Sequence, residues 1–279
     1  MDNALFLSFD DNYWLYARAC LNSLAANFPH HPEVVVYYPG NSEPVLANLA
    51  KRNRLRLIQN LPGFRLPEQL STGEVGSLRV YDKYFAWSSF FDDYANVLYL
   101  DCDVLILRPL DSLFQTDEFM VASNHEPDLN VAVFSPEHQT NSDLSRLLDE
   151  DELTYPYGPD AMCNAGVLLL PPSCRKGEFY ESLLKFTCRY NKFVQYADQS
   201  AITLWCMKHD ISPKLDLTYN FQTPFFGMEE ELCQTPLSEI SILHFSSKRK
   251  PDTFDFIMWQ RIPKTKRQEL ARLFFSYTE

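Results

Sequence analysis

The sequence predicts an α/β fold in which a mostly parallel central sheet is flanked by helices. Short apolar segments at 4–9, 33–38 and 55–59 alternate with amphipathic stretches, an order typical of strands joined by helical crossovers. A longer apolar run, 96–107, has the pattern of a strand that is buried on both faces. Hydrophobic residues make up 46% of the chain and no low-complexity linker interrupts it, so we expect a single domain over 1–279.

The first expected strand is followed by a polar turn and an amphipathic helix. Asp11 or Asn12 can cap this helix, and Pro29 ends it. Its apolar positions recur at spacings of three and four: Ala17, Cys20, Leu21, Leu24 and Phe28. After the second strand, Pro44 stands in the first turn of another helix. The third strand leads through a polar loop to a helix over 77–91, which precedes the long apolar run.

The second half of the chain is less regular. Strands are expected at 118–123, 131–134, 163–170 and 240–244. Helices are expected at 141–153, 178–192 and 197–208. The tail, 263–279, has the basic and apolar pattern of an amphipathic helix. Such a helix either packs on its own domain or makes peripheral contact with an anionic membrane, and both interpretations stay open.

Asp101 and Asp103 stand inside the long apolar run. Residues two apart on a strand point to the same side, so both carboxylates are expected to face one direction. At a separation of about 6 Å they would repel each other by roughly 3 kcal/mol at an effective dielectric constant of about 20. A divalent cation removes this repulsion, and oxygen ligands suit Mn²⁺ or Mg²⁺. The alternative is a strand that ends at Leu100 and leaves both carboxylates in a solvated turn.

Charge and cysteine content exclude several classes of protein. A net charge of −12 argues against nucleic acid as a partner, because phosphate backbones are bound by basic faces. The seven cysteines are scattered without CxxC pairs or zinc-like spacing, which favours a reducing compartment. We find no signal-peptide pattern and no run near the roughly 20 apolar residues of a membrane span, so we expect a cytoplasmic protein. The GxxxxGK[ST] and GxGxxG phosphate-binding motifs are also missing.

Polar side chains follow two of the expected strands at their carboxyl ends. Asp10, Asp11 and Asn12 follow the first strand, whereas Asp101 and Asp103 belong to the fourth. In open parallel sheets, ligands bind outside the carboxyl ends of the strands. We therefore expect these two clusters, about 90 residues apart in sequence, to share one edge of the sheet.

Five short motifs, taken in order, resemble those of the family 8 glycosyltransferases, a group that includes glycogenin and bacterial lipopolysaccharide galactosyltransferases. They are DDNY at 10–13, YLDCD at 99–103, NAGV at 164–167, DQ at 198–199 and HFSSKRKP at 244–251. Each motif alone is a weak signal, but five in order on an alternating strand and helix pattern form a strong one. The resemblance implies a GT-A fold with a Rossmann-like sheet. It also implies retaining transfer of a hexosyl unit from a UDP-sugar.

The resemblance implies roles for individual residues. Asp101, Asp103 and His244 would bind Mn²⁺, with Mg²⁺ as the alternative, and Asp101 would also touch the donor ribose. A mixed oxygen and nitrogen ligand set suits Mn²⁺ somewhat better. Lys250 would contact the diphosphate. The other donor-binding residues would be Ser8, Phe9, Asp10, Asn12, Tyr13, Lys83 and Cys102. Three residues would line the sugar and its reacting carbon: Asn164, Asp198 and Gln199.

Several of these assignments keep an alternative. Arg79 competes with Lys83 for the donor contact, and Asp198 has a second interpretation as a helix cap. Retention could proceed through a covalent intermediate on Asp198 or by acceptor attack from the face of the leaving group. The small residues at 164–166 would let substrate approach the backbone, or they mark only a tight strand entry. Within the domain, the nucleotide is expected on 1–110, and the sugar and acceptor on 111–262.

The last motif departs from the family pattern HFxGxxKPW, because Ser247 replaces the glycine and Asp252 the tryptophan. This departure suggests, as an alternative, a nucleotide-sugar-binding module with reduced catalysis. A sugar-1-phosphate nucleotidylyltransferase is a further alternative, but its glycine-rich loop after the first strand is absent. The expected partners are a UDP-sugar donor, carrying glucose, galactose or N-acetylglucosamine, and a glycan, glycolipid or glycoprotein acceptor.

Overall fold

The computed structural model describes residues 2–67, 70, 78–124, 133–154, 162–227, 232, 234–246 and 262–279. Within these ranges the chain forms a six-stranded and a three-stranded sheet. The large sheet contains, in spatial order, β3 (Leu55–Ile58), β2 (Glu33–Tyr37), β1 (Ala4–Ser8), β4 (Val97–Leu100), β7 (Cys163–Leu170) and β6 (Met120–Ser123). The small sheet contains β5 (Val104–Ile106), β9 (Ile242–His244) and β8 (Phe221–Gln222).

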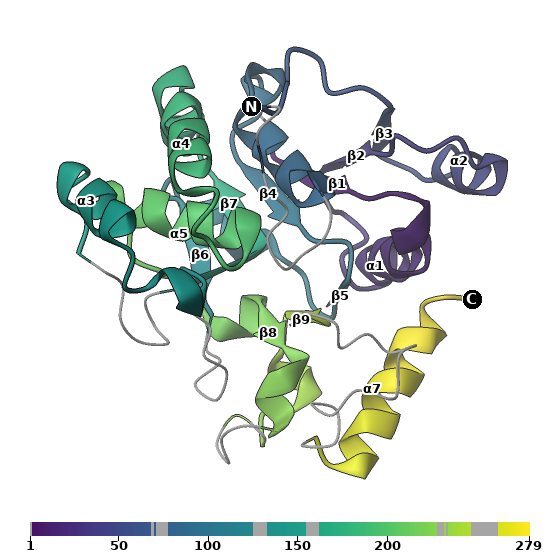
Figure 1. Ribbon diagram of the computed structural model, residues 1–279. Coiled ribbons are helices and arrows are strands. Elements are labelled where there is room, and N and C mark those ends of the chain that lie inside the picture. Colours follow the sequence, from purple (N-terminus) through teal and green to yellow (C-terminus); the bar gives the residue numbers. More distant parts are fainter. Residues whose placement is uncertain are drawn as a thin grey trace.

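Helices cover both faces of the large sheet. The α-helices are α1 (Trp14–Asn27), α2 (Glu43–Leu49), α3 (Ser142–Glu150), α4 (Gly177–Tyr190), α5 (Ala197–Lys208) and α7 (Lys264–Ser276). The 3-10 helices that bear on the site are η1 (Asp11–Tyr13), η3 (Leu78–Trp87), η4 (Ser89–Phe91) and η9 (Leu217–Tyr219). Figure 1 shows α4 and α5, in green, on the opposite side of the sheet from α1, in purple.

The predicted α/β class and the mostly parallel sheet are confirmed. Strands β1, β2 and β3 pair in parallel, and β4 joins them on the other side of β1. Strand β7 then runs antiparallel to β4. Because Phe6 of β1 lies opposite Tyr99 of β4, the carboxyl ends of these two strands meet at one edge. The expectation that the two polar clusters share an edge is therefore confirmed.

The long apolar run is not one strand, and that prediction is wrong. Strand β4 ends at Leu100, the chain turns, and β5 begins at Val104 in the other sheet. The two halves diverge because β4 pairs with β7 whereas β5 pairs with β9. The alternative is correct about the strand end but wrong about solvation, since Asp103 is only 7% exposed. The two aspartates therefore lie at the junction of the sheets.

The helix expected over 77–91 is a 3-10 helix, η3, followed by the short turn η4. Three of its aromatic residues, Tyr81, Tyr84 and Trp87, recur every three positions, and three residues make one turn of a 3-10 helix. The rings of Tyr81 and Tyr84 meet edge to face with centroids 5.5 Å apart, and those of Tyr84 and Trp87 at 6.1 Å. This aromatic ladder accounts for a 3-10 segment that is longer than usual.

The expected tail helix packs on its own domain. In α7, Leu270 and Phe274 are buried, and the Phe274 ring contacts the rings of Tyr16 and Phe245. This packing accounts for the apolar face of the helix, drawn in yellow in Figure 1. No helix among the described residues combines the length and hydropathy needed to cross a bilayer. Of the strand expected at 131–134, Phe134 forms an isolated bridge with Val194, and the first two residues lie outside the described ranges.

Candidate active site

The ladder between β5 and β9 brings Asp103 beside His244. Val104 pairs with His244, and the amide of Phe245 donates to the Asp103 carbonyl over 2.9 Å. The Asp103 side chain, one residue before β5, then lies with Oδ1 3.3 Å from His244 Nε2. Pairing of two short strands thus joins residues that are far apart in the sequence.

Asp101 uses its two carboxylate oxygens differently. Oδ1 accepts a hydrogen bond of 2.6 Å from the Tyr99 hydroxyl and lies 3.3 Å from Lys83 Nζ. Oδ2 faces His244, with Nε2 at 4.0 Å. The chain therefore fixes one oxygen of Asp101 internally and directs the other toward the imidazole.

Asp101, Asp103 and His244 fit a divalent cation. One ligand atom from each lies within 4.8 Å of the others, and these atoms are two carboxylate oxygens and one imidazole nitrogen. Neighbouring ligands of an octahedral ion with bonds of about 2.1 Å stand about 3 Å apart. The separation of 3.3 Å between Asp103 Oδ1 and His244 Nε2 is close to that value. The donor set is also the mixture that Mn²⁺ accepts.

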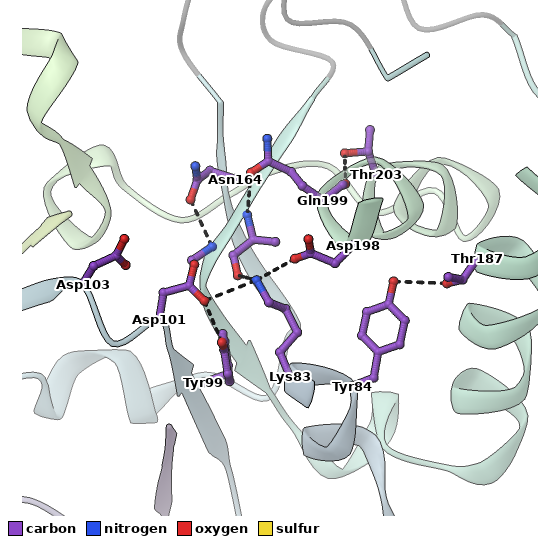
Figure 2. Close-up of polar contacts among 12 residues, drawn as sticks. Lys83, Tyr84, Tyr99, Asp101, Asp103, Asn164, Thr187, Asp198, Gln199 and Thr203 are labelled. Atoms are coloured by element: carbon purple, nitrogen blue, oxygen red, sulfur yellow. Dashed lines mark hydrogen bonds and ion pairs between the residues drawn. The ribbon is translucent and has the colours of Figure 1, made fainter. Parts of the chain in front are cut away.

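Lys83 connects the two carboxylates that flank the strand β7. Its Nζ lies 2.6 Å from Asp198 Oδ2 and 3.3 Å from Asp101 Oδ1, and it donates to the Ala165 carbonyl over 3.0 Å. Figure 2 shows this lysine rising from η3 between the two aspartates. Lys83 is 4% exposed and Asp198 is 5% exposed, so water contributes little to either charge. Arg79, the alternative to Lys83, instead lies near Asp82 and Tyr37.

Burial and ion pairing shift the pKa values of these groups in opposite directions. Burial alone would lower the pKa of Lys83, but the carboxylates of Asp101 and Asp198 outweigh it and the pKa is raised. Burial opposes ionisation of Asp101, yet Lys83 and His244 hold its pKa below the ordinary value. For Asp198, burial raises the pKa and Lys83 only partly offsets this effect. Lys83 is therefore the cation on which both carboxylates depend.

Asn164 and Gly166 make contacts within the interior of the site. The Asn164 Oδ1 atom accepts from the Gly166 amide at 3.0 Å and from Asn220 Nδ2 at 2.9 Å. A Cβ on Gly166 would lie 2.2 Å from His244 Cε1. Gly166 therefore makes room for an imidazole of the same chain, and the two interpretations of 164–166, as room for substrate or as a tight strand entry, stay predictions.

Asn220 is a site residue that the sequence analysis missed. It follows η9, is completely buried, and its Oδ1 lies 2.8 Å from His244 Nδ1. The available signal was a lone amide side chain between Tyr219 and Phe221, but no motif distinguished it.

Gln199 lies beside Asp198 in the first turn of α5. Its Oε1 accepts from the Ala165 amide over 3.4 Å, and its backbone carbonyl accepts from the Thr203 hydroxyl. The peptide of Ala165 is thus held from both sides, since its carbonyl accepts from Lys83. The Asp198 Oδ2 atom binds Lys83 over 2.6 Å, and the carboxylate also has a hydrogen bond to its own backbone N–H in the first turn of α5.

The residues that follow β1 form another side of the candidate active site. Asp10 caps η1, because its Oδ1 accepts from the Asn12 amide at 3.0 Å. Tyr13 is 43% exposed, and partial burial together with the nearby acidic groups of Cys102 and Asp101 raises the pKa of its phenol. Tyr13 therefore stands close to the end of β4, with an aromatic ring open to solvent.

The remaining predicted residues differ in position. Phe9 is buried against the rings of Trp14 and Tyr38, so its side chain belongs to the core. Ser8 is half-buried at the end of β1, and its hydroxyl hydrogen-bonds Tyr99, the residue that donates to Asp101. Cys102 is buried among apolar side chains on the α1 side of the sheet. Lys250, Ser247 and Asp252 lie outside the described residues.

A cavity of about 540 Å³ lies away from this site. Its lining includes Trp87, Arg175 and Tyr180 but none of the candidate active-site residues described in this subsection. Arg175 donates to the carbonyls of Tyr94 and Ala95, which precede β4. The cavity is therefore near the amino end of β4, whereas Asp101 follows its carboxyl end.

Asp82 gives a stability prediction. Burial raises its pKa to about 6, although Arg79 opposes the shift. The shift from 3.8 corresponds to at most about 3 kcal/mol. Because the pKa is higher in the folded than in the unfolded state, ionisation of Asp82 destabilises the fold. The stability associated with the protonated carboxyl is fully present below pH 4 and is lost as the pH rises through 6. We therefore expect Asp82→Asn to be more stable than the wild type at pH 8, with the difference vanishing near pH 3.5. Urea unfolding at both pH values measures this, and a gain independent of pH would contradict it.

Solved glycosyltransferases share this GT-A fold. Galactosyltransferase LgtC, in complex with donor and acceptor sugar analogues, is 20% identical with a TM-score of 0.61, over 96% of this chain and 95% of that one. The bifunctional WbbM glycosyltransferase is 15% identical with a TM-score of 0.67, over 99% of this chain and 49% of that one. Mouse xyloside xylosyltransferase 1 is 17% identical with a TM-score of 0.55, over 89% and 99%. These structures define the fold class.

The sequence assigns the family within that class. The profile of glycosyl transferase family 8 matches residues 4–253, which is most of the chain. The chain therefore belongs to glycosyl transferase family 8 and is a glycosyltransferase. No curated protein sequence matches it.

Proposed function

We propose that this chain transfers a hexosyl unit from a UDP-sugar to a glycan, glycolipid or glycoprotein acceptor, in a metal-dependent reaction that retains the anomeric configuration. The observation that carries the proposal is the convergence of Asp101, Asp103 and His244 beside the buried pair of Lys83 and Asp198. A bound Mn²⁺ or Mg²⁺ would neutralise the charge that develops on the departing diphosphate. Membership of family 8 supports the same reaction class.

The edge formed by β1 and β4 suits the nucleotide. We propose that Asp10 and Asn12 contact uracil and ribose, with the exposed ring of Tyr13 beside them. Asp101 would contact the ribose as well as the cation, and Lys250 the diphosphate. In this arrangement the nucleotide binds to 1–110, whereas the sugar and acceptor bind mainly to 111–262.

The ion pair of Lys83 with Asp198 favours one of the two routes to retention. A carboxylate nucleophile must approach the reacting carbon, but Asp198 Oδ2 is held 2.6 Å from Lys83 Nζ in a buried pair. Asp198 is therefore better placed to orient the sugar and stabilise positive charge on it, with Gln199 beside it. We propose that the acceptor attacks from the face of the leaving group. NMR comparison of the product and donor anomers tests retention, and an inverted product would refute it.

A panel of UDP-sugars tests the function. Purified protein is incubated with UDP-glucose, UDP-galactose and UDP-N-acetylglucosamine, with and without Mn²⁺, and released UDP is measured. We expect slow hydrolysis of one donor that requires the metal and becomes faster with a suitable acceptor. Metal-dependent binding of UDP without turnover would instead indicate a binding module with reduced catalysis. Neither binding nor turnover with any donor would overturn the proposal.

Asp103→Asn tests the proposed metal group. The substitution keeps the size of the side chain but removes its charge, so we expect turnover to fall by roughly 100-fold or more, with the fold intact. Excess Mn²⁺ should recover part of the activity. Asp111→Asn is the matched control, because Asp111 is exposed beyond β5, and its turnover should equal that of the wild type. An unchanged rate in Asp103→Asn would remove Asp103 from the metal group.

A further inference from the structure

A chain of three hydrogen bonds leads from the backbone of β7 to the imidazole of His244. The Gly166 amide lies 3.0 Å from Asn164 Oδ1, which lies 2.9 Å from Asn220 Nδ2. The other end of the Asn220 amide, Oδ1, lies 2.8 Å from His244 Nδ1. All four residues belong to the interior, and Asn220 itself has no exposed surface.

The direction of every bond follows from the first one. A backbone N–H can only donate, so the Asn164 atom that faces Gly166 must be the carbonyl oxygen. That oxygen can only accept, so the Asn220 atom that faces it must belong to the amino group. The orientations of both amides are therefore fixed by the main chain.

The same logic reaches the histidine. With its amino group directed to Asn164, Asn220 presents its carbonyl oxygen to His244 Nδ1, and this oxygen accepts a hydrogen bond. Nδ1 must then carry a hydrogen. In a neutral imidazole the lone pair belongs to the other nitrogen, Nε2, which lies 3.3 Å from Asp103 Oδ1 and 4.0 Å from Asp101 Oδ2. This is the tautomer that a cation held by the two aspartates requires.

We propose that Asn220 is a positioning residue that holds His244 in the Nδ1-protonated tautomer and aims Nε2 at the cation, with its own orientation set by the Gly166 amide through Asn164. The proposal rests on the metal group of the proposed function. Partners of this kind on a ligating histidine typically contribute 10-fold to 100-fold to metal affinity. Asn220 would act only through the imidazole, without touching the cation.

Asn124 provides a matched control within the same cluster. It is also a buried asparagine, and its Oδ1 lies 3.5 Å from Asn164 Nδ2. It therefore contacts the amino end of Asn164, whereas the bonds that orient His244 use the carbonyl end. Removing the Asn124 amide leaves the path from Gly166 to His244 intact.

Manganese binding without any nucleotide sugar tests the proposal. Free Mn²⁺ is measured by electron paramagnetic resonance during titration of the wild type, Asn220→Leu and Asn124→Leu. We expect the dissociation constant to rise 10-fold to 100-fold in Asn220→Leu and to stay near the wild-type value in Asn124→Leu. Equal affinity in the wild type and Asn220→Leu overturns the proposal. So does a wild type that binds no Mn²⁺, or an equal loss in both variants.

The tautomer itself can be observed in the wild type. Long-range ¹H–¹⁵N spectra of histidine-labelled, metal-free protein, at a pH high enough for a neutral ring, distinguish protonated from unprotonated ring nitrogens, and the absence of signals in His244→Gln assigns the residue. We expect a hydrogen on Nδ1 and none on Nε2, and the reverse assignment overturns the proposal. This measurement decides the matter even if Asn220→Leu fails to fold. A wild type that shows this tautomer and binds Mn²⁺ but turns over no UDP-sugar would refute the proposed function and leave this inference standing.

Discussion

Replacing Lys83 by methionine is expected to lower the free energy of unfolding by about 3–5 kcal/mol at pH 8 and to abolish transfer activity. Methionine preserves most of the volume of the side chain but removes the only charge that lies between Asp101 and Asp198 in the described structure. Asp198 is 5% exposed, so its carboxylate cannot recover hydration when the ammonium is removed. Urea unfolding with circular dichroism measures the loss.

The pH dependence and a double variant identify the cause. Without Lys83, burial raises the pKa of Asp198 further, so the instability of Lys83→Met should diminish as the pH falls toward 4. Adding Asp198→Asn removes the unpaired charge and should recover much of the stability but none of the activity. Lys214→Met is the surface control, because its pair with Glu118 is exposed, and it should cost less than about 1 kcal/mol. Full stability in Lys83→Met alone would show that the ion pair is not needed.

The sequence predicts best those elements whose signal is local. Strand β7 and helix α5 have the predicted bounds, because small or polar residues and prolines mark where their apolar patterns begin or end. The stretch at 96–107 failed for the opposite reason. Both of its halves are apolar, and only their partners β7 and β9, which lie much later in the chain, assign them to different sheets.

The residues of the site likewise divide into those with a local sequence signal and those whose contacts depend on distant parts of the chain. Asp101, Asp103 and His244 belong to recognisable motifs, and the structure brings them together. The contact of Lys83 with both Asp101 and Asp198 could not be predicted. It depends on a 3-10 helix that places the lysine against the Ala165 carbonyl of β7. Asn220 belongs to no motif, and only the structure shows that it hydrogen-bonds both Asn164 and His244.

Gly166→Ala is expected to displace His244 and to lower Mn²⁺ affinity by about 10-fold to 100-fold, the range seen when the support of a ligating histidine is lost. The new Cβ would lie 2.2 Å from His244 Cε1 and 2.8 Å from Nδ1, distances at which something must move. The ring is the far end of a side chain, whereas Gly166 is fixed in the eight-residue strand β7. The imidazole therefore moves, and its bond to Asn220 is lost. Overpacking should also cost about 1–3 kcal/mol of stability.

Two further variants separate the steric effect from the chemical one. Gly177→Ala is the control, since a Cβ there meets nothing within 4 Å, and it should leave both stability and Mn²⁺ affinity near the wild-type values. His244→Ala removes the obstructing ring, so combining it with Gly166→Ala should cost little stability beyond that of His244→Ala alone, while metal binding stays low. Retained Mn²⁺ affinity in Gly166→Ala would contradict the prediction. It would mean that the β7 backbone moves while the His244 ring stays in place, so that the backbone does not determine the orientation of the imidazole.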